Sequence, residues 1–231
     1  MSALPRIAAI GTGRMGRGIG HVFAYAGFPV EIIDLKPREP AAAAKLAAEA
    51  KAEVAENLQS LIALGVMTAE QAPAILDRIA VVSADAAPAA LARADVIFEG
   101  VTETMEAKRD AFARACAHAR PDAIIASTTS TILVDTLAGF VTHPERFLNT
   151  HYLNPAYLVP LVEISPGKAT DPAVTARMKA LLEQAGKVPV LCAASPGFIV
   201  PRIQSVARAE AARIVGEGLA TAEDVDKATR Y

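Results

Sequence analysis

The glycine-rich turn Gly11-Thr12-Gly13-Arg14-Met15-Gly16 constrains the fold of this chain more than any other feature of its sequence. It follows the short apolar run 7–10, which predicts a buried strand, and it opens a helix predicted over residues 14–25. Another strand is predicted over residues 30–34. A strand, a tight turn, a helix and a second strand form a βαβ unit, the building block of parallel sheets covered by helices.

The spacing of the three glycines indicates a phosphate-binding turn. Gly11 allows the tight turn, Gly13 lets a pyrophosphate approach the backbone, and Gly16 lets the helix pack closely on the strand. The free N–H groups at the start of the helix would then face the negative charge. The sequence therefore predicts a dinucleotide site in which Arg14 and Met15 take part as the first residues of the helix.

An acidic residue at the end of the second strand indicates which dinucleotide binds. Asp34 follows Gly11 by 23 residues, where its carboxylate can accept hydrogen bonds from the adenine-ribose hydroxyls. The same charge would repel a 2′-phosphate, so NAD is favoured over NADP. Lys36 and Arg38 lie close enough in the sequence to soften that preference. A glycine-rich turn used only for packing is the alternative.

The rest of the first 195 residues continues the alternation of strands and helices. Residues 41–64 and 68–76 predict a helical hairpin that projects from the sheet. Continuous apolar strands that alternate with helices are typical of a parallel sheet covered on both faces. We therefore predict an α/β fold, with a Rossmann-type, doubly wound and mostly parallel sheet in a domain of residues 1–195. The further strands are predicted over residues 79–82, 96–98, 123–126, 147–150, 161–164 and 188–191, and the further helices over residues 88–93, 104–120, 132–137 and 171–186.

The character of the chain changes at Ser195-Pro196-Gly197. A long helix is predicted over residues 201–217, with an apolar stripe that includes Ile203 and Val206, and Thr221 is predicted to cap a last helix. Two helices cannot enclose a core, so residues 196–231 predict the beginning of an all-helical C-terminal domain. The stripe needs a cover from the first domain, from further residues or from another subunit, and the last possibility predicts a homodimer.

Composition and charge argue against several classes of partner. The 231 residues are 52% hydrophobic and 21% charged, with a net charge of −2, as is typical of a globular protein. This balance favours neither a nucleic-acid backbone nor a membrane surface, and no run reaches the ~18–20 apolar residues of a membrane span. The start of the sequence leaves no room for an export signal. Cys116 and Cys192 are expected to be reduced packing residues, so we expect a cytoplasmic protein.

A histidine and a glutamate supply the reactive groups. His151 stands in His151-Tyr152-Leu153-Asn154-Pro155, and Glu163 follows it by twelve residues within an apolar strand. A histidine takes up and releases a proton near neutral pH, and a carboxylate on its other ring nitrogen fixes its tautomer. Because a dinucleotide site precedes the pair in the sequence, the pair indicates a dehydrogenase that oxidises an alcohol without a metal. A structural histidine at a strand end is the alternative.

Six motifs, in order and with matching spacing, carry a resemblance to a known family. They are residues 11–19, 99–103, 126–130, 151–155, 161–164 and 196–200. Through them the chain resembles the N-terminal part of the L-3-hydroxyacyl-CoA dehydrogenases, the group that includes 3-hydroxybutyryl-CoA dehydrogenases. The resemblance implies NAD-dependent oxidation of an L-3-hydroxyacyl-CoA thioester to the 3-oxoacyl-CoA, as part of fatty acid metabolism.

The resemblance also implies roles for individual residues. His151 would be the general base that takes the 3-hydroxyl proton as hydride leaves C3, and Glu163 would orient it. Ser130 would hydrogen-bond the substrate oxygen, and Asn154 would lie between the substrate and the nicotinamide. Ser130 could instead cap a helix that begins at Thr131, and Asn154 could be a turn former.

Two charged residues match positions near the nicotinamide ribose in the family. They are Glu103 and Lys108, for which a solvated helix face is the alternative. Three further histidines have no partner that converges on them in the sequence, so we expect them on the surface of helices or loops: His21, His118 and His143.

Three features depart from the pattern of the family. Pro201 stands where the family usually has an asparagine that helps to fix the substrate, and the family's serine and lysine contacts to coenzyme A fall roughly at Asn57 and Leu64. Family members also continue well beyond the position of Tyr231. These departures leave two alternatives open: the same chemistry on a free or ring-bearing 3-hydroxy acid, and a dinucleotide-binding subunit without turnover.

Overall fold

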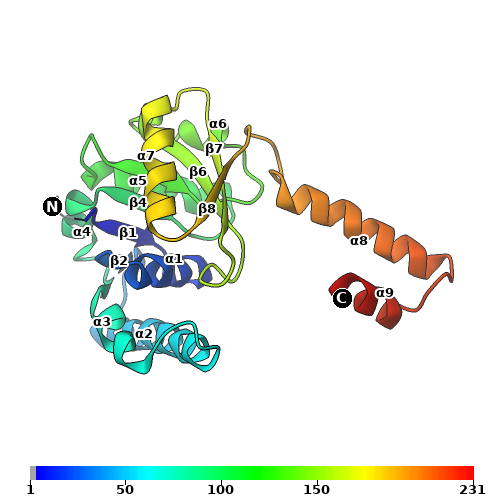
Figure 1. Cartoon of the computed structure of the whole chain (residues 1–231). Helices are drawn as coiled ribbons and strands as arrows, with labels where there is room; N and C mark the ends of the chain where they lie inside the picture. Colours follow the sequence, from blue (N-terminus) through cyan, green and yellow to red (C-terminus); the bar gives the residue numbers. More distant parts are fainter. Residues whose placement is uncertain (1–3) are drawn as a thin grey trace.

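The computed structural model describes residues 4–231, which form a sheet between two layers of helices and two further helices that extend from it (Figure 1). Within this range eight strands lie in the order β3-β2-β1-β4-β5-β6-β7-β8. The first six are parallel to one another, β7 is antiparallel to β6, and β8 is parallel to β7. The strands are β1 (Ile7–Ile10), β2 (Val30–Ile33), β3 (Ile79–Val82), β4 (Val96–Glu99), β5 (Ile124–Ser127), β6 (Phe147–Tyr152), β7 (Leu161–Pro166) and β8 (Val188–Leu191). The predicted doubly wound, mostly parallel sheet is confirmed.

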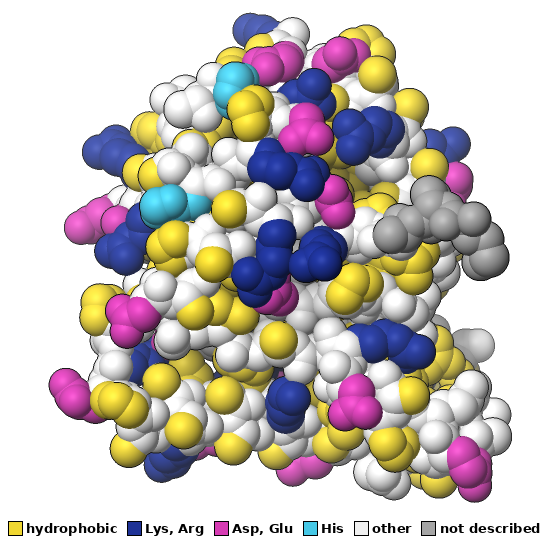
Figure 2. All heavy atoms as spheres, turned by 90° about the vertical axis from the view of Figure 1, so that its left-hand side faces the viewer, with side chains coloured by type: hydrophobic (Ala, Val, Ile, Leu, Met, Phe, Trp, Pro, Cys, Tyr) yellow, Lys and Arg dark blue, Asp and Glu magenta, His cyan; other side chains and the backbone are white. Residues whose placement is uncertain are grey.

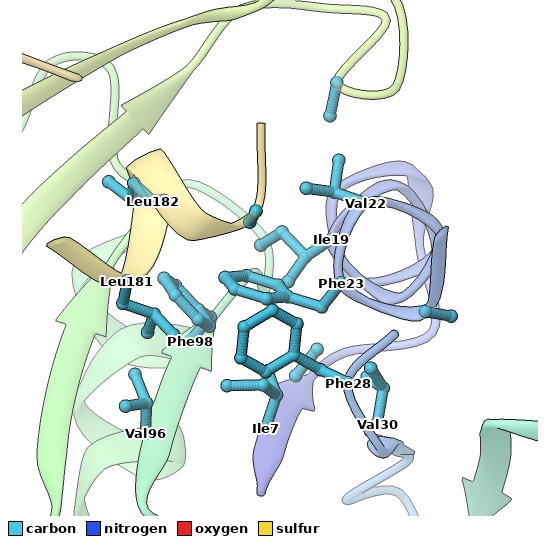
Figure 3. Close-up of a cluster of buried hydrophobic side chains, with 14 of the residues drawn as sticks. Ile7, Ile19, Val22, Phe23, Phe28, Val30, Val96, Phe98, Leu181 and Leu182 are labelled. Carbon is cyan, nitrogen blue, oxygen red and sulfur yellow. The ribbon is translucent and has the colours of Figure 1, made fainter. Parts of the chain in front are cut away.

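Helices cover both faces of this sheet and bury two apolar clusters. One cluster joins the sheet to α1, α2 and α7, and the other joins it to α4, α5 and α6. In the first cluster the Phe23 ring lies between Phe28 and Phe98, with ring centroids 5.5 and 5.2 Å apart (Figure 3). The helices are α1 (Arg14–Tyr25), α2 (Pro40–Ala63), α3 (Ala72–Asp77), α4 (Ala87–Arg93), α5 (Met105–His118), α6 (Val134–Ala138), α7 (Pro172–Gln184), α8 (Val200–Gly216) and α9 (Ala222–Arg230). The predicted hairpin of α2 and α3 is present at the edge of the domain.

The strand order reverses between β1 and β4, which are neighbours in the sheet. The chain leaves β1 toward β2 on one side and returns from β3 to β4 on the other. In open α/β sheets a crevice forms at the carboxyl ends of the strands at such a reversal, and ligands bind there. The fold therefore places the glycine-rich turn, which follows β1, at a position suited to a ligand.

Helices α8 and α9 extend away from the sheet (Figure 1). The apolar stripe on α8 is open, with Ile203 64% and Val206 72% exposed. Thr221 caps α9 as predicted, because its hydroxyl accepts a hydrogen bond from the Asp224 amide at 3.1 Å. The stripe is therefore a surface within residues 4–231 that the first domain does not cover.

Charged side chains of both signs share one face of the molecule. On the face shown in Figure 2, basic and acidic side chains are interspersed. Among the helices of residues 4–231, none is long and apolar enough to cross a membrane. The same residues hold no cluster of three or more histidine, cysteine or acidic side chains suited to a metal ion.

The prediction for one of the three other histidines was wrong. His118 and His143 are exposed, but His21 on α1 is 1% exposed. Its ring stacks on Tyr157 with centroids 4.8 Å apart, and neither ring nitrogen has a hydrogen-bond partner among the described residues. This burial could not be predicted from local sequence, because the loop that carries Tyr157 reaches α1 only in the folded chain.

The burial of His21 predicts an acid-sensitive step in stability. Burial, together with the nearby Lys187 cation, lowers the pKa of His21 from 6.5 to about 4. Between these values the unfolded chain binds a proton that the folded chain does not, so stability falls as the pH drops from 6.5 to 4. We expect a cost of about 3 kcal/mol, at 1.36 kcal/mol per unit. Denaturant unfolding of His21→Phe at the two pH values should lack this component, and the exposed-site control His118→Gln should retain it. Equal losses for His21→Phe and the wild type would contradict the prediction.

Candidate active site

The glycine-rich turn is held by contacts that tolerate no side chain at two of its positions. Gly11 has φ +104°, in the left-handed region that favours glycine, and a Cβ on it would lie 2.8 Å from the Gly100 carbonyl oxygen. A Cβ on Gly16 would lie 1.7 Å from the Gly11 carbonyl oxygen. A Cβ added to Gly100 would lie 3.1 Å from the Cβ of Met15, so the turn also packs closely on the residue that follows β4. These contacts explain the first and third glycines from the fold itself.

Gly13 needs a different explanation. Its φ of −81° and ψ of −172° are ordinary extended values, and a Cβ on it would meet no atom of residues 4–231 within 4 Å. The turn lines a cavity of about 720 Å³, together with residues 34–38 after β2 and residues 100–102 after β4. Arg14 is exposed at the start of α1, which has no side-chain cap. The open space and the free helix N-terminus fit the pyrophosphate of a dinucleotide.

Asp34 also lines this cavity, just after β2, and an acid at this position is expected to meet the adenine ribose. Its carboxylate is 7% exposed and accepts hydrogen bonds from the Lys36 amide at 3.2 Å and from the Arg38 guanidinium. A carboxylate has about four acceptor positions, so two contacts leave room for ribose hydroxyls. Arg38 forms an ion pair with Asp34. This pair partly neutralises the Asp34 charge that would repel a 2′-phosphate.

The histidine and the glutamate stand directly opposite each other across β6 and β7. The antiparallel register pairs His151 with Glu163, and both side chains are buried, at 4% and 0% exposed. Nδ1 of His151 lies 2.7 Å from Oε2 of Glu163, and Nε2 lies 3.1 Å from the Ser130 hydroxyl. Directly opposed residues of antiparallel strands have neighbouring side chains. The reversal of β7 therefore creates the pair.

The second oxygen of Glu163 binds the beginning of α8. Oε1 accepts hydrogen bonds from the backbone N–H groups of Ile199 and Val200, at 2.9 and 2.8 Å. Phe198, with a strained φ of +43°, packs its ring 5.2 Å from the His151 ring. The motif that contains these three residues was part of the family resemblance, but no chemical role was predicted for it.

Ser130 lies in an exposed loop between β5 and α6, beside the buried pair. The alternative of a capping serine is wrong, because α6 begins at Val134 with Leu133 as its capping residue. The carboxylate of Glu103 binds the Ser130 amide at 3.0 Å. Thr102, the neighbour of Glu103, lines the glycine-turn cavity, so the loop and the cavity are adjacent.

The structure excludes a solvated helix face for Lys108. Its side chain is 1% exposed, and Nζ lies within 3.1 Å of carboxylate oxygens of Glu99 and Glu103. Glu99 is fully buried and was absent from the predicted site. Its position at the end of the predicted strand 96–98 and its place in the motif 99–103 were the signals that could have indicated it.

Asn154 and Pro201 lie just after the segments that carry His151 and the amides bound to Glu163. Asn154 is exposed, three residues after His151, and joins Pro155 by a cis peptide bond in the turn that follows β6. Pro201 is the second residue of α8, directly after the amides that bind Glu163. Of the two candidate coenzyme A positions, Asn57 is half-buried and Leu64 is 69% exposed.

These features combine a dinucleotide cavity with a base suited to removing a hydroxyl proton. A neutral imidazole whose Nδ1–H is held by a carboxylate presents Nε2 as the proton acceptor. An alcohol that loses its hydroxyl proton to such a base can lose hydride from the same carbon to a nicotinamide. The fold and the site together define a dinucleotide-dependent oxidoreductase.

Comparison with known proteins gives the family. Residues 6–195 match the NAD-binding domain of 3-hydroxyacyl-CoA dehydrogenase, and residues 197–231 match the C-terminal domain of the same family. The chain therefore belongs to the 3-hydroxyacyl-CoA dehydrogenase family, and its cofactor is NAD.

Individual relatives agree with this assignment. A 3-hydroxybutyryl-CoA dehydrogenase from Bradyrhizobium diazoefficiens is 35% identical over 99% of this chain and 75% of its own length. The crystal structure of (S)-3-hydroxybutyryl-CoA dehydrogenase from Ralstonia eutropha is similar with a TM-score of 0.85 and 30% identity, over 96% of this chain and 75% of that one. A 5-formyl-3-hydroxy-2-methylpyridine 4-carboxylic acid 5-dehydrogenase is similar with a TM-score of 0.83 and 28% identity, over 99% and 70%.

The empty space at Gly13 gives a test of the cofactor site. In Gly13→Ala the added methyl group meets no protein atom within 4 Å, so the melting temperature should stay unchanged. The methyl group would occupy the position where the pyrophosphate approaches, so the dissociation constant for NAD should rise at least about tenfold, or about 1.4 kcal/mol. Calorimetric titration measures this constant. Gly216→Ala, also in open space but at the end of α8, is the control. Unchanged NAD binding in Gly13→Ala would contradict the prediction.

Proposed function

We propose that this chain oxidises an L-3-hydroxyacyl-CoA thioester, such as 3-hydroxybutyryl-CoA, to the 3-oxoacyl-CoA, with the His151–Glu163 pair as general base. The observation that carries the proposal is the alignment at His151: Nδ1 lies 2.7 Å from the buried carboxylate and Nε2 lies 3.1 Å from the hydroxyl of Ser130. Relatives that the chain resembles along nearly its whole length are named as 3-hydroxybutyryl-CoA dehydrogenases, which supports the choice of substrate.

Each residue of the candidate site has a defined task in this reaction. Nε2 of His151 takes the 3-hydroxyl proton, and Glu163 stabilises the imidazolium that results. The Ser130 hydroxyl donates a hydrogen bond to the substrate oxygen, where negative charge develops. Asn154, at the exposed turn beyond β6, contacts the substrate on the side of the nicotinamide. When it is bound, NAD supplies the hydride acceptor.

The cofactor is held by the turn and by the end of β2. Gly11, Gly13 and Gly16 shape the turn, and the backbone of Arg14 and Met15 presents N–H groups to the pyrophosphate. The other contacts proposed for the cofactor are the carboxylate of Asp34 on the adenine ribose and the side chains of Glu103 and Lys108 toward the nicotinamide ribose.

An assay with the thioester tests the proposal directly. Reduced nicotinamide should accumulate when the protein is mixed with NAD and (S)-3-hydroxybutyryl-CoA, and the product should be acetoacetyl-CoA by mass spectrometry. The (R) enantiomer is the matched control and should give no product. NAD binding by calorimetry without turnover on any hydroxyacyl thioester or hydroxy acid would identify the chain as a non-catalytic binding subunit.

A free or ring-bearing 3-hydroxy acid is a second candidate substrate. Pro201 offers no side-chain donor at a position near the base, and the exposed Leu64 offers no charge for a coenzyme A phosphate. The structural similarity to a dehydrogenase of a pyridine carboxylic acid is compatible with a ring-bearing substrate. Comparison of kcat/KM for thioesters, free 3-hydroxy acids and aromatic hydroxy acids separates the two candidates.

A second copy of this chain is the proposed cover for α8. The apolar stripe around Ile203 and Val206 lines a hollow of about 770 Å³ that is open to solvent. Pairing of two such faces would bury the stripe, which supports a homodimer through the helical C-terminal region. Sedimentation at micromolar concentration should show a dimer, and a monomer would count against it. The two free cysteines, Cys116 and Cys192, suit the reducing cytoplasm, where we place the protein.

A further inference from the structure

The lysine at the beginning of α5 lies in an unfavourable position for a cation. Lys108 is in the first turns of α5, and its side chain is 1% exposed. Burial of an ammonium group is costly unless it is paired, and the positive end of a helix dipole at its N-terminus also disfavours a cation there. A costly arrangement that violates local preferences often marks a functional site.

Lys108 is paired with two carboxylates, Glu99 and Glu103. Nζ lies 3.0 and 2.9 Å from the two carboxylate oxygens of Glu99 and 3.1 Å from Oε2 of Glu103. The ammonium group is thus paired with two carboxylates, which offsets the cost of its burial. Glu99 is fixed in turn, because it accepts hydrogen bonds from the Val101 amide at 2.8 Å and the Ser127 hydroxyl at 2.7 Å. Glu99 therefore holds the Lys108 ammonium group in a fixed position, where it also contacts Glu103.

Glu103 connects this lysine to the loop of the candidate catalytic serine. Its Oε1 accepts hydrogen bonds from the Thr129 hydroxyl, from the Ser130 amide at 3.0 Å and from the Thr131 amide at 3.3 Å. Partial burial raises the pKa of Glu103, but the Thr129 hydroxyl, the Lys108 charge and the Ser130 amide together lower it below its usual value. The carboxylate therefore stays charged at neutral pH and continues to accept these bonds.

A second contact holds the same loop, from the neighbouring strand β6. Nδ2 of Asn149 on β6 donates to the Thr129 carbonyl oxygen at 3.2 Å. The backbone on both sides of Ser130 is thus tied down, while the Ser130 side chain itself is exposed and lies 3.1 Å from Nε2 of His151. The contacts run without a gap from Glu99 through Lys108 and Glu103 to the serine.

We propose that Lys108 is a positioning residue that holds Glu103 against the backbone of residues 129–131 and so fixes the Ser130 hydroxyl relative to His151. The inference rests on the proposed function, in which Ser130 meets the substrate oxygen. It goes beyond a contact of Lys108 with the nicotinamide ribose, because it gives Lys108 an effect on the serine loop through Glu103.

The test replaces the buried pair without leaving a lone charge. Lys108→Met alone would strand Glu99 as an unpaired buried carboxylate, so the variant is the double substitution E99Q/K108M. The matched control is E183Q/K179M, which removes an exposed ion pair on α7. Amide hydrogen exchange at Ser130 and Thr131 should become at least about tenfold faster in the first variant and stay unchanged in the control. Unchanged exchange at both amides in E99Q/K108M would overturn the proposal.

Kinetics give a second readout. We expect kcat at saturating NAD to fall by a factor of about 10 to 100, because a small misplacement of a positioned group has effects of this size. In a Ser130→Ala background E99Q/K108M should lower kcat little further, because both changes act on the same contact of the Ser130 hydroxyl with the substrate oxygen. Weaker NAD binding with full kcat at saturating NAD would support the ribose contact instead. Absence of turnover in the wild type would refute the proposed function, and the exchange experiment would still decide this inference.

Discussion

His151→Gln is expected to bind NAD with the wild-type dissociation constant and to turn over 3-hydroxybutyryl-CoA about 10²–10⁴-fold more slowly. The glutamine amide is similar in length to the imidazole and can keep a hydrogen bond to Glu163, but it cannot accept the hydroxyl proton. The side chain is buried on β6, and His151 is not among the residues that line the glycine-turn cavity, so cofactor binding should not change. Steady-state kinetics and calorimetry measure the two effects separately.

The chain supplies a matched control for this change. His118 is exposed on α5, so His118→Gln should have wild-type kcat and wild-type NAD affinity. If His151→Gln retained more than about a tenth of the wild-type kcat, the histidine would have no role as the base. A loss of NAD binding in His151→Gln would point instead to a disturbed fold.

Glu163→Gln is expected to lower kcat by about 10³–10⁴-fold, although it changes a single oxygen to nitrogen. The carboxylate accepts from His151 with one oxygen and from the Ile199 and Val200 amides with the other. An amide has one oxygen, so one of the two sets of donors must face an NH₂ group. If the NH₂ group faces His151, it forces the tautomer with hydrogen on Nε2, which cannot act as a base. If it faces the amides, the beginning of α8 loses its acceptor.

Amide exchange distinguishes these two orientations. Faster exchange at Ile199 and Val200 in Glu163→Gln shows that the oxygen has turned to the histidine, and unchanged exchange shows the reverse. The control is Glu183→Gln, at a half-exposed acid on α7, which should leave both kcat and exchange at wild-type values. Near-wild-type kcat in Glu163→Gln would show that the carboxylate does not set the tautomer.

The parts of the fold that follow local rules could be predicted from the sequence. The glycine-rich turn located β1 and α1, because the fold itself requires glycine at positions 11 and 16. The predicted range of α2 lies within one residue of Pro40–Ala63. His151 and Glu163 could be recognised as a pair because a glutamate within an apolar strand needs a partner. The structure brings their side chains together as expected.

Contacts between distant segments could not be predicted. Nothing in the sequence near Leu161–Pro166 indicates that this strand runs antiparallel to its neighbour, yet that direction sets His151 opposite Glu163. The burial of Lys108 depends on an acid nine residues earlier that ends another element, and the burial of His21 depends on a loop more than a hundred residues away. Periodicity describes one element at a time and is silent about such pairs.

The shared carboxylate of Glu163 has a consequence for variants far from the reacting atoms. The same side chain that aligns the imidazole also receives the backbone where the C-terminal helices depart. A substitution or ligand that pulls residues 198–200 outward therefore removes support from the base without touching it. The connector between the two parts of the chain is therefore coupled to the proposed base, and we expect substitutions in it to lower turnover more than they lower stability.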